Sequence, residues 1–353
     1  MEAGAKLRTA RLAAGVSLGQ LSRITHYSKA HLSNVEAGRR PATAELVASY
    51  EGALGDVMQR RGLLTGVAAA AFAPSVAQDL LRRGFAAALR GRCSEDEWHV
   101  RSDGYGRDYM ELGAPELQDR LSGDLITLQQ HLETPRMWGT AARLMTLWGK
   151  VSGGPKESIE WYRLAAQAAD RSGDDDLRSW VRGRAAIALA YEGAALPVAR
   201  TLARGALTVS DRPGIGTLNA RLALGHAAAI AGDRAAATRE LETAQRIHDE
   251  KASEEQVSDF AVPEWRMSVM MGLAYARLGD ERRALVEQAT VRRTIPSHLV
   301  RFETHLQLHK ALLMAKAGDR SAGVEHGRAA LDKLAPEKRS QSLRLMLAEV
   351  ERV

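Results

Sequence analysis

The chain has 353 residues, of which 5% are aromatic and one, Cys93, is a cysteine. This length is sufficient for two or three domains. A lone cysteine excludes an intramolecular disulfide framework, so we expect a reducing, cytoplasmic compartment. No apolar run reaches the roughly 18 residues that a membrane-spanning helix needs, and no membrane partner is predicted. Abundant alanine favours an all-α fold whose helices pack closely through small residues.

Positive charge is concentrated near the N-terminus. Residues 1–61 carry nine Lys or Arg and five Asp or Glu, whereas the rest of the chain carries 40 basic and 38 acidic side chains. A small basic module on a nearly neutral body indicates that one part of the protein binds a polyanion.

Residues 3–55 divide into short predicted helices. Ser17 and Gln20 form the capping box of the second helix. Ser28 caps the third, which ends at Gly38. Two short helices joined by a tight turn, within a domain of four or five helices, predict a helix-turn-helix arrangement over residues 1–58.

The third helix carries residue types that can read DNA. Its leading surface can enter the major groove, where lysine donates to guanine and asparagine pairs bidentately with adenine. The arginines that follow the helix are expected to reach phosphates, which position the protein without specifying sequence. A helical bundle with a merely solvated basic face is the alternative. The predicted DNA-binding residues are Ser28, Lys29, Ala30, Ser33, Asn34, Arg39 and Arg40.

The stretch "LRTARLAAGVSLGQLSRITHYSKAHLSNVEAGRRPA" closely resembles the XRE family, the phage-repressor type of helix-turn-helix protein. The resemblance covers about the first 55 residues, and "LSNVEAGRRPA" is its most specific portion. It implies that Lys29, Ala30 and Asn34 face bases. It also implies a structural salt bridge between Arg11 and Glu36.

The stretch "RRGLLTGVAAAAFAPSVA", Arg60–Ala77, has features of a twin-arginine export signal but begins sixty residues into the chain. Its position after a DNA-binding module disfavours export. Apolar residues from Leu64 to Phe72 fall on one helical stripe. We therefore predict linker helices over residues 59–109, which dock the module to the body or contribute to a dimer.

From residue 110 to residue 353, helix pairs recur around glycine turns. Before each turn lies an alanine-rich helix, such as "ARLALGHAAAIAGD", and a second helix follows. Small residues in the first helix and a Gly-Asp turn are typical of tetratricopeptide packing, so we predict a tetratricopeptide-like α-solenoid of about five units. The predicted turns lie at Gly149, Gly193, Gly232, Gly279 and Gly318.

Such an array forms a concave groove lined by the first helix of each pair. An outer, solvated face is the alternative position for the polar residues on these helices. The residues predicted by position to bind a ligand in the groove are Arg182, Asn219, Arg221, His226, Arg266, Met270, His305 and His309.

Three histidines raise the question of a metal. His298, His305 and His309 share one face of a predicted helix, and two imidazoles four residues apart can ligate a transition metal. No carboxylate or cysteine completes the set at an obvious spacing, so no metal or other cofactor is predicted. The sequence also lacks a P-loop, a nucleophile elbow, an HExxH motif and a dinucleotide fingerprint, and no enzymatic activity is predicted.

An XRE-type module joined to a tetratricopeptide-like array resembles a broad class of bacterial regulators, including peptide-responsive quorum-sensing ones, and the Ala/Arg/Gly-rich composition looks actinobacterial. The resemblance implies a cytoplasmic homodimer that binds a double-stranded DNA operator. Its array would sense a peptide, a small molecule or a protein partner and modulate that binding. One alternative is a tetratricopeptide interaction scaffold or anti-regulator with weak or vestigial DNA binding. A metal-dependent enzyme is a third reading, resting only on the three histidines.

Overall fold

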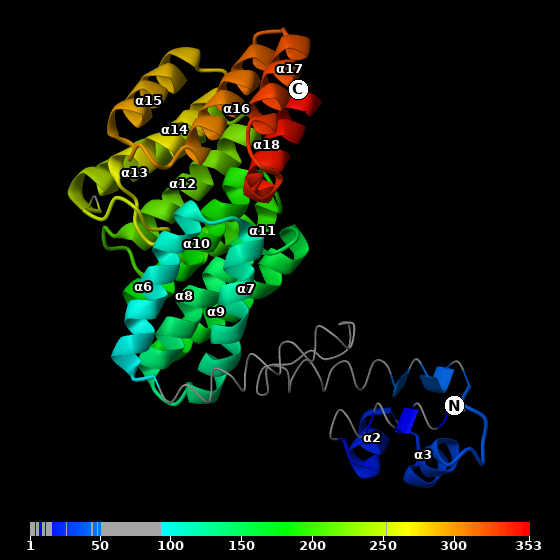
Figure 1. Cartoon of the computed structure of the whole chain (residues 1–353). Coiled ribbons are helices and arrows are strands. Elements are labelled where there is room, and N and C mark those ends of the chain that lie inside the picture. The colour runs from blue at the N-terminus through cyan, green and yellow to red at the C-terminus, as the bar shows by residue number, and fades with distance from the viewer. Residues whose placement is uncertain are drawn as a thin grey trace. The chain divides into compact units, whose positions relative to one another are not determined.

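The described part of the chain is helical throughout. The computed structural model, shown in Figure 1, describes Gly4, Leu7, Arg8, Arg11 and residues 16–25, 27–43, 45–47, 49–50, 93–251 and 253–353. Over these residues, helices alternate with turns and loops, which confirms the all-α fold class. The chain divides into two compact units, residues 1–82 and 83–353. None of the described helices has both the length and the apolar character needed to cross a membrane.

In the first unit, α2 (Leu18–Thr25) and α3 (Lys29–Glu36) form the predicted pair of short helices. The two helices pack against each other, and both bury apolar side chains. Burial of these side chains orients α3 so that its polar residues stay on the other side of the helix. The core of the unit contains Leu7, Val16, Leu21, Leu32, Val35, Leu46 and Tyr50.

Side-chain caps start both helices where the sequence predicts them. The Gln20 backbone N–H donates to Ser17 Oγ at 3.2 Å, and the Ser17 N–H donates to the Gln20 side chain at 2.8 Å. The His31 N–H donates to Ser28 Oγ at 3.2 Å. Gly38, with φ of 71°, follows α3 in the left-handed conformation that glycine adopts without steric cost. Each side-chain cap contributes about 1 kcal/mol to helix stability.

The second unit consists of helix pairs that stack in a repeat-like array (Figure 1). The pairs are α8 with α9, α10 with α11, α12 with α13, α14 with α15, and α16 with α17. Ahead of them, α6 and α7 pack on α8, and at the other end α18 packs on α16 and α17 and also reaches α10. The bounds are α6 (Glu95–Glu111), α7 (Ala114–Leu128), η1 (Gln129–His131), α8 (Pro135–Val151), α9 (Pro155–Ser172), α10 (Asp175–Glu192), α11 (Leu196–Val209), α12 (Ile215–Ile230), α13 (Arg234–Lys251), α14 (Glu264–Arg277), α15 (Glu281–Thr294), α16 (Arg301–Lys316), α17 (Arg320–Asp332), η2 (Pro336–Lys338) and α18 (Gln341–Arg352).

Of the predicted linker, residues 59–109, only the last part is described. The predicted apolar stripe from Leu64 to Phe72 lies outside the described residues. Residues 95–109 belong to α6, whose Trp98 side chain is fully buried in a cluster shared with α7 and α8. This helix is therefore an integral part of the second unit.

Left-handed glycines join the two helices of four successive pairs. Gly193, Gly232, Gly279 and Gly318 have φ of 69°, 76°, 68° and 102°, as the sequence predicts for turns at these positions. In three of the turns the next residue is an aspartate whose carboxylate accepts a backbone N–H of the following helix. These aspartates are Asp233, Asp280 and Asp319.

The predicted turn at Gly149 is wrong. Gly149 lies inside α8, and a Cβ there would come within 2.5 Å of the Tyr162 ring on α9. Glycine is required at this position because the two helices approach closely, and the turn follows at residues 152–154. In the sequence, a glycine at a close contact between helices near a polar loop looks the same as a glycine in the turn itself.

The first helices of neighbouring pairs approach most closely where α10 meets α12. A Cβ added to Gly183 would lie 2.2 Å from the Gly216 carbonyl oxygen, and one added to Gly216 would lie 2.5 Å from Ser179 Oγ. Both contacts are far shorter than a van der Waals distance, so no side chain fits at either glycine. The two helices are therefore packed backbone to backbone.

A loop crosses the inner helices and is held by buried charges. We call the connection between α13 and α14, residues 253–263, the strap. The fully buried Asp259 carboxylate accepts from Arg184 at 2.7 Å, from Arg266 at 2.6 Å and from Lys150 in a shorter contact. The Asp259 N–H also donates to the Gly106 carbonyl at 2.8 Å. The strap thereby links α6, α8, α10 and α14.

The charges around Asp259 offset its burial. Burial alone would raise the pKa of this carboxyl, but Arg184, Lys150 and Arg266 together lower its pKa below the ordinary range. Asp259 is therefore ionised wherever the protein is folded, and it neutralises part of the surrounding positive charge.

The α10–α12 contact yields a stability prediction. Gly183→Ala should lower the free energy of unfolding by about 1–3 kcal/mol, because the backbone of α12 must move away from the new methyl group. Urea denaturation followed by circular dichroism measures this. Gly104→Ala in α6 is the matched control, because nothing lies within 4 Å of a Cβ there. Alanine at that helical site should stabilise by up to about 1 kcal/mol. Equal effects of the two substitutions would show that the close approach is not limiting.

Candidate functional site

One face of α3 presents the residues predicted to read bases. Lys29 and Ser33, like Ala30 and Asn34, are four residues apart, which puts both pairs on the same side of the helix. Lys29 and Ala30 are exposed, and Ser33 and Asn34 are partly exposed. Ser28, at the start of the helix, is exposed as well. The structure therefore brings the five residues together on one accessible surface.

A buried ion pair holds α3 from its other side. Arg11 donates to Glu36 through Nε and Nη2, both at 2.6 Å, and to the Val16 carbonyl through Nη1 at 2.8 Å. The Tyr50 hydroxyl donates to Glu36 Oε1 at 3.0 Å. The Arg11 and Glu36 side chains are only 8% and 4% exposed. The salt bridge implied by the XRE resemblance is thus present.

Hydrogen bonds connect Glu36 to both Arg11 and Tyr50. The hydrogen bond to Glu36 raises the pKa of the Arg11 guanidinium. Burial, and then the Glu36 carboxylate, raises the pKa of Tyr50 above its usual value. Because the Arg11 pair is bidentate, it fixes direction as well as distance. It therefore sets the rotation of α3 about its own axis.

The backbone fixes the two arginines that follow α3. The N–H groups of Arg39 and Arg40 donate to the Asn34 carbonyl at 2.8 and 3.2 Å. Both residues are exposed. Among the described residues, neither Lys29 nor Arg39 has an acidic partner for its side chain. This cationic edge is consequently free to meet phosphates.

Sequence reasoning missed two residues of this surface, Tyr27 and His31. Their rings stack with centroids 5.4 Å apart and planes 17° apart. His31 Nδ1 lies 3.2 Å from Arg40 Nη1, and because a guanidinium only donates, the imidazole nitrogen is the acceptor. The spacing of four residues between two aromatic rings, across the start of a helix, was the available signal. The stacked pair positions the Arg40 guanidinium beside α3.

Most of the predicted groove residues lie in the protein interior. Their helices are covered by neighbouring helices, by the strap or by α18, so a position on the first helix of a pair gives no access to solvent here. Six of the eight are less than 9% exposed: Asn219, His226, Arg266, Met270, His305 and His309.

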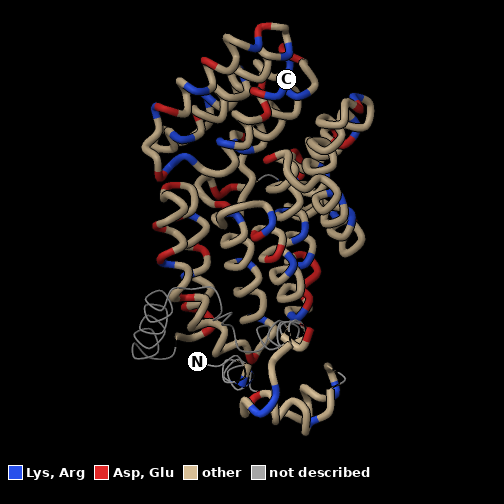
Figure 2. The backbone as a smooth tube through the Cα atoms, turned by 90° about the vertical axis from the view of Figure 1, so that its right-hand side faces the viewer, with Lys and Arg blue, Asp and Glu red and all other residues tan. Residues whose placement is uncertain are grey.

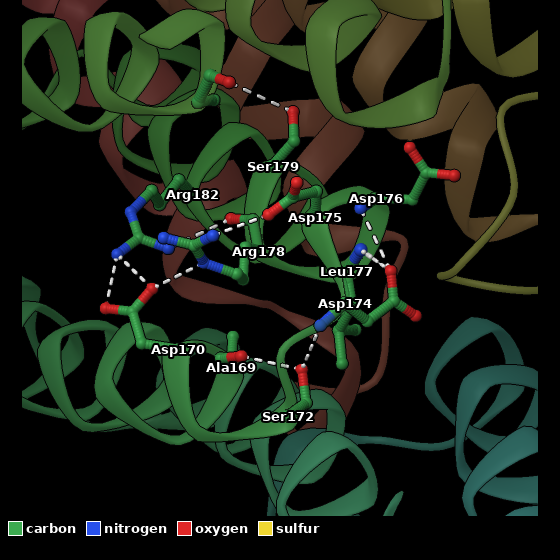
Figure 3. Close-up of polar contacts among 11 residues, drawn as sticks. Ala169, Asp170, Ser172, Asp174, Asp175, Asp176, Leu177, Arg178, Ser179 and Arg182 are labelled. Atoms are coloured by element: carbon green, nitrogen blue, oxygen red, sulfur yellow. Dashed lines mark hydrogen bonds and ion pairs between the residues drawn. The ribbon is translucent and has the colours of Figure 1, made fainter. Parts of the chain in front are cut away.

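The other two predicted groove residues are bound to acidic partners. Arg182 Nη2 donates to both Asp170 oxygens, at 2.7 and 2.8 Å, and Arg178 donates to the same carboxylate at 3.0 Å (Figure 3). Arg221 donates to Glu240 at 3.0 Å. These contacts link α9 to α10 and α12 to α13. Figure 2 shows acidic and basic residues interspersed along the second unit.

Three of the buried residues form an imidazole cluster around Tyr191. The Tyr191 hydroxyl lies 3.0 Å from His305 Nδ1 and 3.3 Å from His309 Nε2. Arg277 donates to His226 Nδ1 at 2.8 Å, and burial lowers the pKa of all three histidines, that of His309 to about 3. The three imidazoles are therefore neutral in the folded protein.

The histidines do not assemble as a metal site. His298 precedes α16 and lies 3.6 Å from Glu111, apart from the buried pair His305 and His309. Within the described ranges, no group of three or more His, Cys, Asp or Glu side chains is arranged to hold a metal ion.

Comparison with known proteins identifies only the first unit. A family model described as a helix-turn-helix domain matches residues 2–55. No curated protein matches the chain. No solved structure matches it either. The protein thus has an N-terminal helix-turn-helix domain, which suggests DNA binding, followed by a helical region of paired helices.

The buried pair of the first unit yields a second prediction. Arg11→Met should lower the free energy of unfolding by about 3–5 kcal/mol, because it leaves the Glu36 carboxylate buried without its cation. Tyr50→Phe is the control: it removes one hydrogen bond but keeps the ion pair, and should cost about 1 kcal/mol. Hydrogen exchange of residues 18–36 in the full chain, read by mass spectrometry, reports both effects. Unchanged protection in Arg11→Met would show that the ion pair does not hold α3.

The imidazole cluster yields a third prediction, on pH. The folded pKa of His309 is depressed, so below about pH 6.5 the unfolded state takes up a proton that the folded state refuses. Its stabilising contribution is complete above that pH and is lost as the pH falls toward about 3. Between pH 7 and pH 5 the loss should be about 2 kcal/mol for His309 alone.

Denaturation at both pH values tests this. In His309→Gln, the free energy of unfolding that is lost between pH 7 and pH 5 should be smaller than in wild type by about 2 kcal/mol. His298→Gln, which removes an imidazole that is 52% exposed, is the control for the loss of a histidine outside the cluster. An equally steep dependence in wild type and His309→Gln would refute the assignment.

Proposed function

We propose that the protein is a sequence-specific DNA-binding transcriptional regulator, and that its helical array senses an effector that modulates operator binding. The observation that carries the proposal is the exposed face of α3. It combines a lysine, an asparagine and small residues with two adjacent arginines, over a core that holds the helix rigidly. The family match over residues 2–55 supports the same reading.

The dimensions of α3 suit a major groove. An α-helix with its side chains is about 10–12 Å in diameter, which fits the major groove of B-form DNA, about 12 Å wide. In this position Lys29 would donate to guanine and Asn34 would pair with adenine. The small side chains of Ala30 and Ser33 would allow α3 to approach the base edges closely between these two contacts.

Arg39 and Arg40 are suited to the DNA backbone. They follow the C-terminal end of α3 and are exposed, which is where a phosphate strand would run beside a helix lying in the groove. Their contribution would be independent of sequence and sensitive to salt. We assign His31 as a positioning residue for Arg40, because its imidazole accepts the Arg40 N–H while stacked on Tyr27.

Variants of the full chain test base readout. The probe is a duplex selected from a random library by the purified protein. Asn34→Ala and Lys29→Ala should each weaken the free energy of binding to the selected duplex by about 1–3 kcal/mol. The loss should be concentrated at one or two base pairs. Arg39→Ala should weaken binding to all sequences alike. Arg204→Ala, an exposed arginine in α11, is the control and should bind as wild type.

Failure of this experiment has a defined meaning. Uniform loss across sequences in Asn34→Ala would remove this residue from base readout. If the wild-type protein selects no sequence at all, the protein is instead an interaction scaffold with weak or vestigial DNA binding.

The proposal includes a homodimer on a palindromic operator. One small module buries too little surface for tight binding, and related folds pair two half-sites about 34 Å apart. About four phosphates per half-site would give eight for a dimer and a log–log salt slope near −7. Sedimentation without DNA and titration over a range of salt measure both. A monomer at micromolar concentration with a slope near −3 would contradict the dimer.

A further inference from the structure

A cavity in the second unit has the size and the polar groups of an effector site, and most of its lining was not predicted from the sequence to bind a ligand. Its volume is about 760 Å³, within the range of small-molecule sites. It opens where α8, α10 and α12 begin, and it is bounded by α6 and by Phe260 of the strap.

The walls of the cavity combine an aromatic corner with aliphatic sides. Trp180 and Phe260 meet edge to face with centroids 5.3 Å apart. Leu177 and Ile215 extend the apolar surface. Arg143 closes one side, with its guanidinium 4.1 Å from the Phe260 ring and bonded to Asp103 at 2.6 Å. A flat or branched apolar group would bury its surface here without displacing a charge.

Two sets of donors among the residues at the cavity have no acceptor. Trp180 lines the cavity and is only 8% exposed, yet its indole N–H has no hydrogen-bond partner among the described residues. Beside it, α12 begins at Gly214, which offers no side-chain cap. By contrast, Thr134 caps α8 and Asp174 caps α10. The positive end of α12 and the indole N–H together provide a site for a carboxylate.

One carboxylate at the rim is uncommitted. Asp174 accepts from the N–H groups of Asp176 and Leu177, as Figure 3 shows, whereas the Asp176 carboxylate has no partner among the described residues. The basic residues of the lining are already paired, since Arg136 contacts Asp96 at 2.6 Å and Arg143 contacts Asp103. The unmatched charge of the lining is therefore negative, and it can bind an ammonium group.

From these groups we infer that the cavity binds an amino-acid-derived zwitterion with an aromatic or branched apolar side chain. Its carboxylate would accept from the Trp180 indole and the first turn of α12, its ammonium group would pair with Asp176, and its side chain would pack on Trp180 and Phe260. The volume admits ligands up to about the size of a small peptide. This inference deepens the proposed function by naming the class of effector.

Binding here would also reach the middle of the second unit. Phe260 forms a cavity wall, and the residue before it on the strap is Asp259, which is bonded to α8, α10 and α14. A ligand that favours one position of Phe260 favours one arrangement of these helices. That is the differential contact that linkage between two sites requires.

Calorimetric titration of the full chain tests the inference, with L-tryptophan, L-phenylalanine and the dipeptide Phe-Leu as probes. We expect at least one to bind, and its N-acetylated and amidated forms to bind about five- to tenfold more weakly, because each lacks one charge of the zwitterion. Asp176→Asn should abolish the discrimination against the N-acetylated form. Trp180→Phe, which keeps the ring but removes the N–H, should weaken the parent probe severalfold.

Two control variants accompany these measurements. Glu325→Gln removes an exposed carboxylate from α17, and Trp161→Phe changes a tryptophan of α9 outside the lining. Both should bind the probes as wild type does. The inference is overturned if no probe binds at millimolar concentration, or if the bound probe is insensitive to Asp176→Asn and Trp180→Phe.

The two proposals can fail separately. Selection of a DNA sequence by the ligand-free protein tests the function of α3 alone, whereas the titrations test the cavity without DNA. A probe that binds should also change the affinity for the selected duplex. Binding that leaves the DNA affinity unchanged would overturn the assignment of this ligand as the effector.

Discussion

The backbone contact between α10 and α12 governs the geometry of the second unit. α10 touches α8, α9, α11, α12 and α18, so its position determines where most of the other helices can lie. That position follows from two missing side chains, at Gly183 and Gly216. The alanine-rich composition lets other helices of the array approach one another closely for the same reason. The second helices also pack through small side chains, such as Ala199, Ala203 and Ala206 of α11.

The two units fix their functional residues by different means. In the first unit a single bidentate ion pair and a small apolar core hold α3, and all of its candidate base-reading residues are left accessible. In the second unit many buried polar residues are hydrogen-bonded to one another, as Arg277 is to Glu349 and His226. Among the residues that line the cavity, the uncommitted groups are the Trp180 indole N–H, the first turn of α12 and the Asp176 carboxylate.

Local signals in the sequence were sufficient for the helices and for the helix-turn-helix face. Ser17, Ser28 and the Gly-Asp turns act on residues within a few positions, so their consequences can be predicted from short stretches. The groove could not be predicted in this way. Whether His309 or Arg266 is exposed to solvent depends on the strap and on neighbouring helices, which come from distant parts of the sequence. Gly149 was misassigned because a close helix crossing and a turn both require glycine.

The ion cluster at Asp259 has a consequence for the order in which the chain folds during synthesis. Asp259 follows Lys150 by 109 residues and Arg184 by 75. At roughly 5–20 residues per second, a ribosome takes on the order of 5–20 s to supply the acid after the lysine has been made. Until then the inner faces of α8 and α10 carry cations with no anion to meet. These unpaired charges therefore disfavour burial of the first half of the array before the strap has been made.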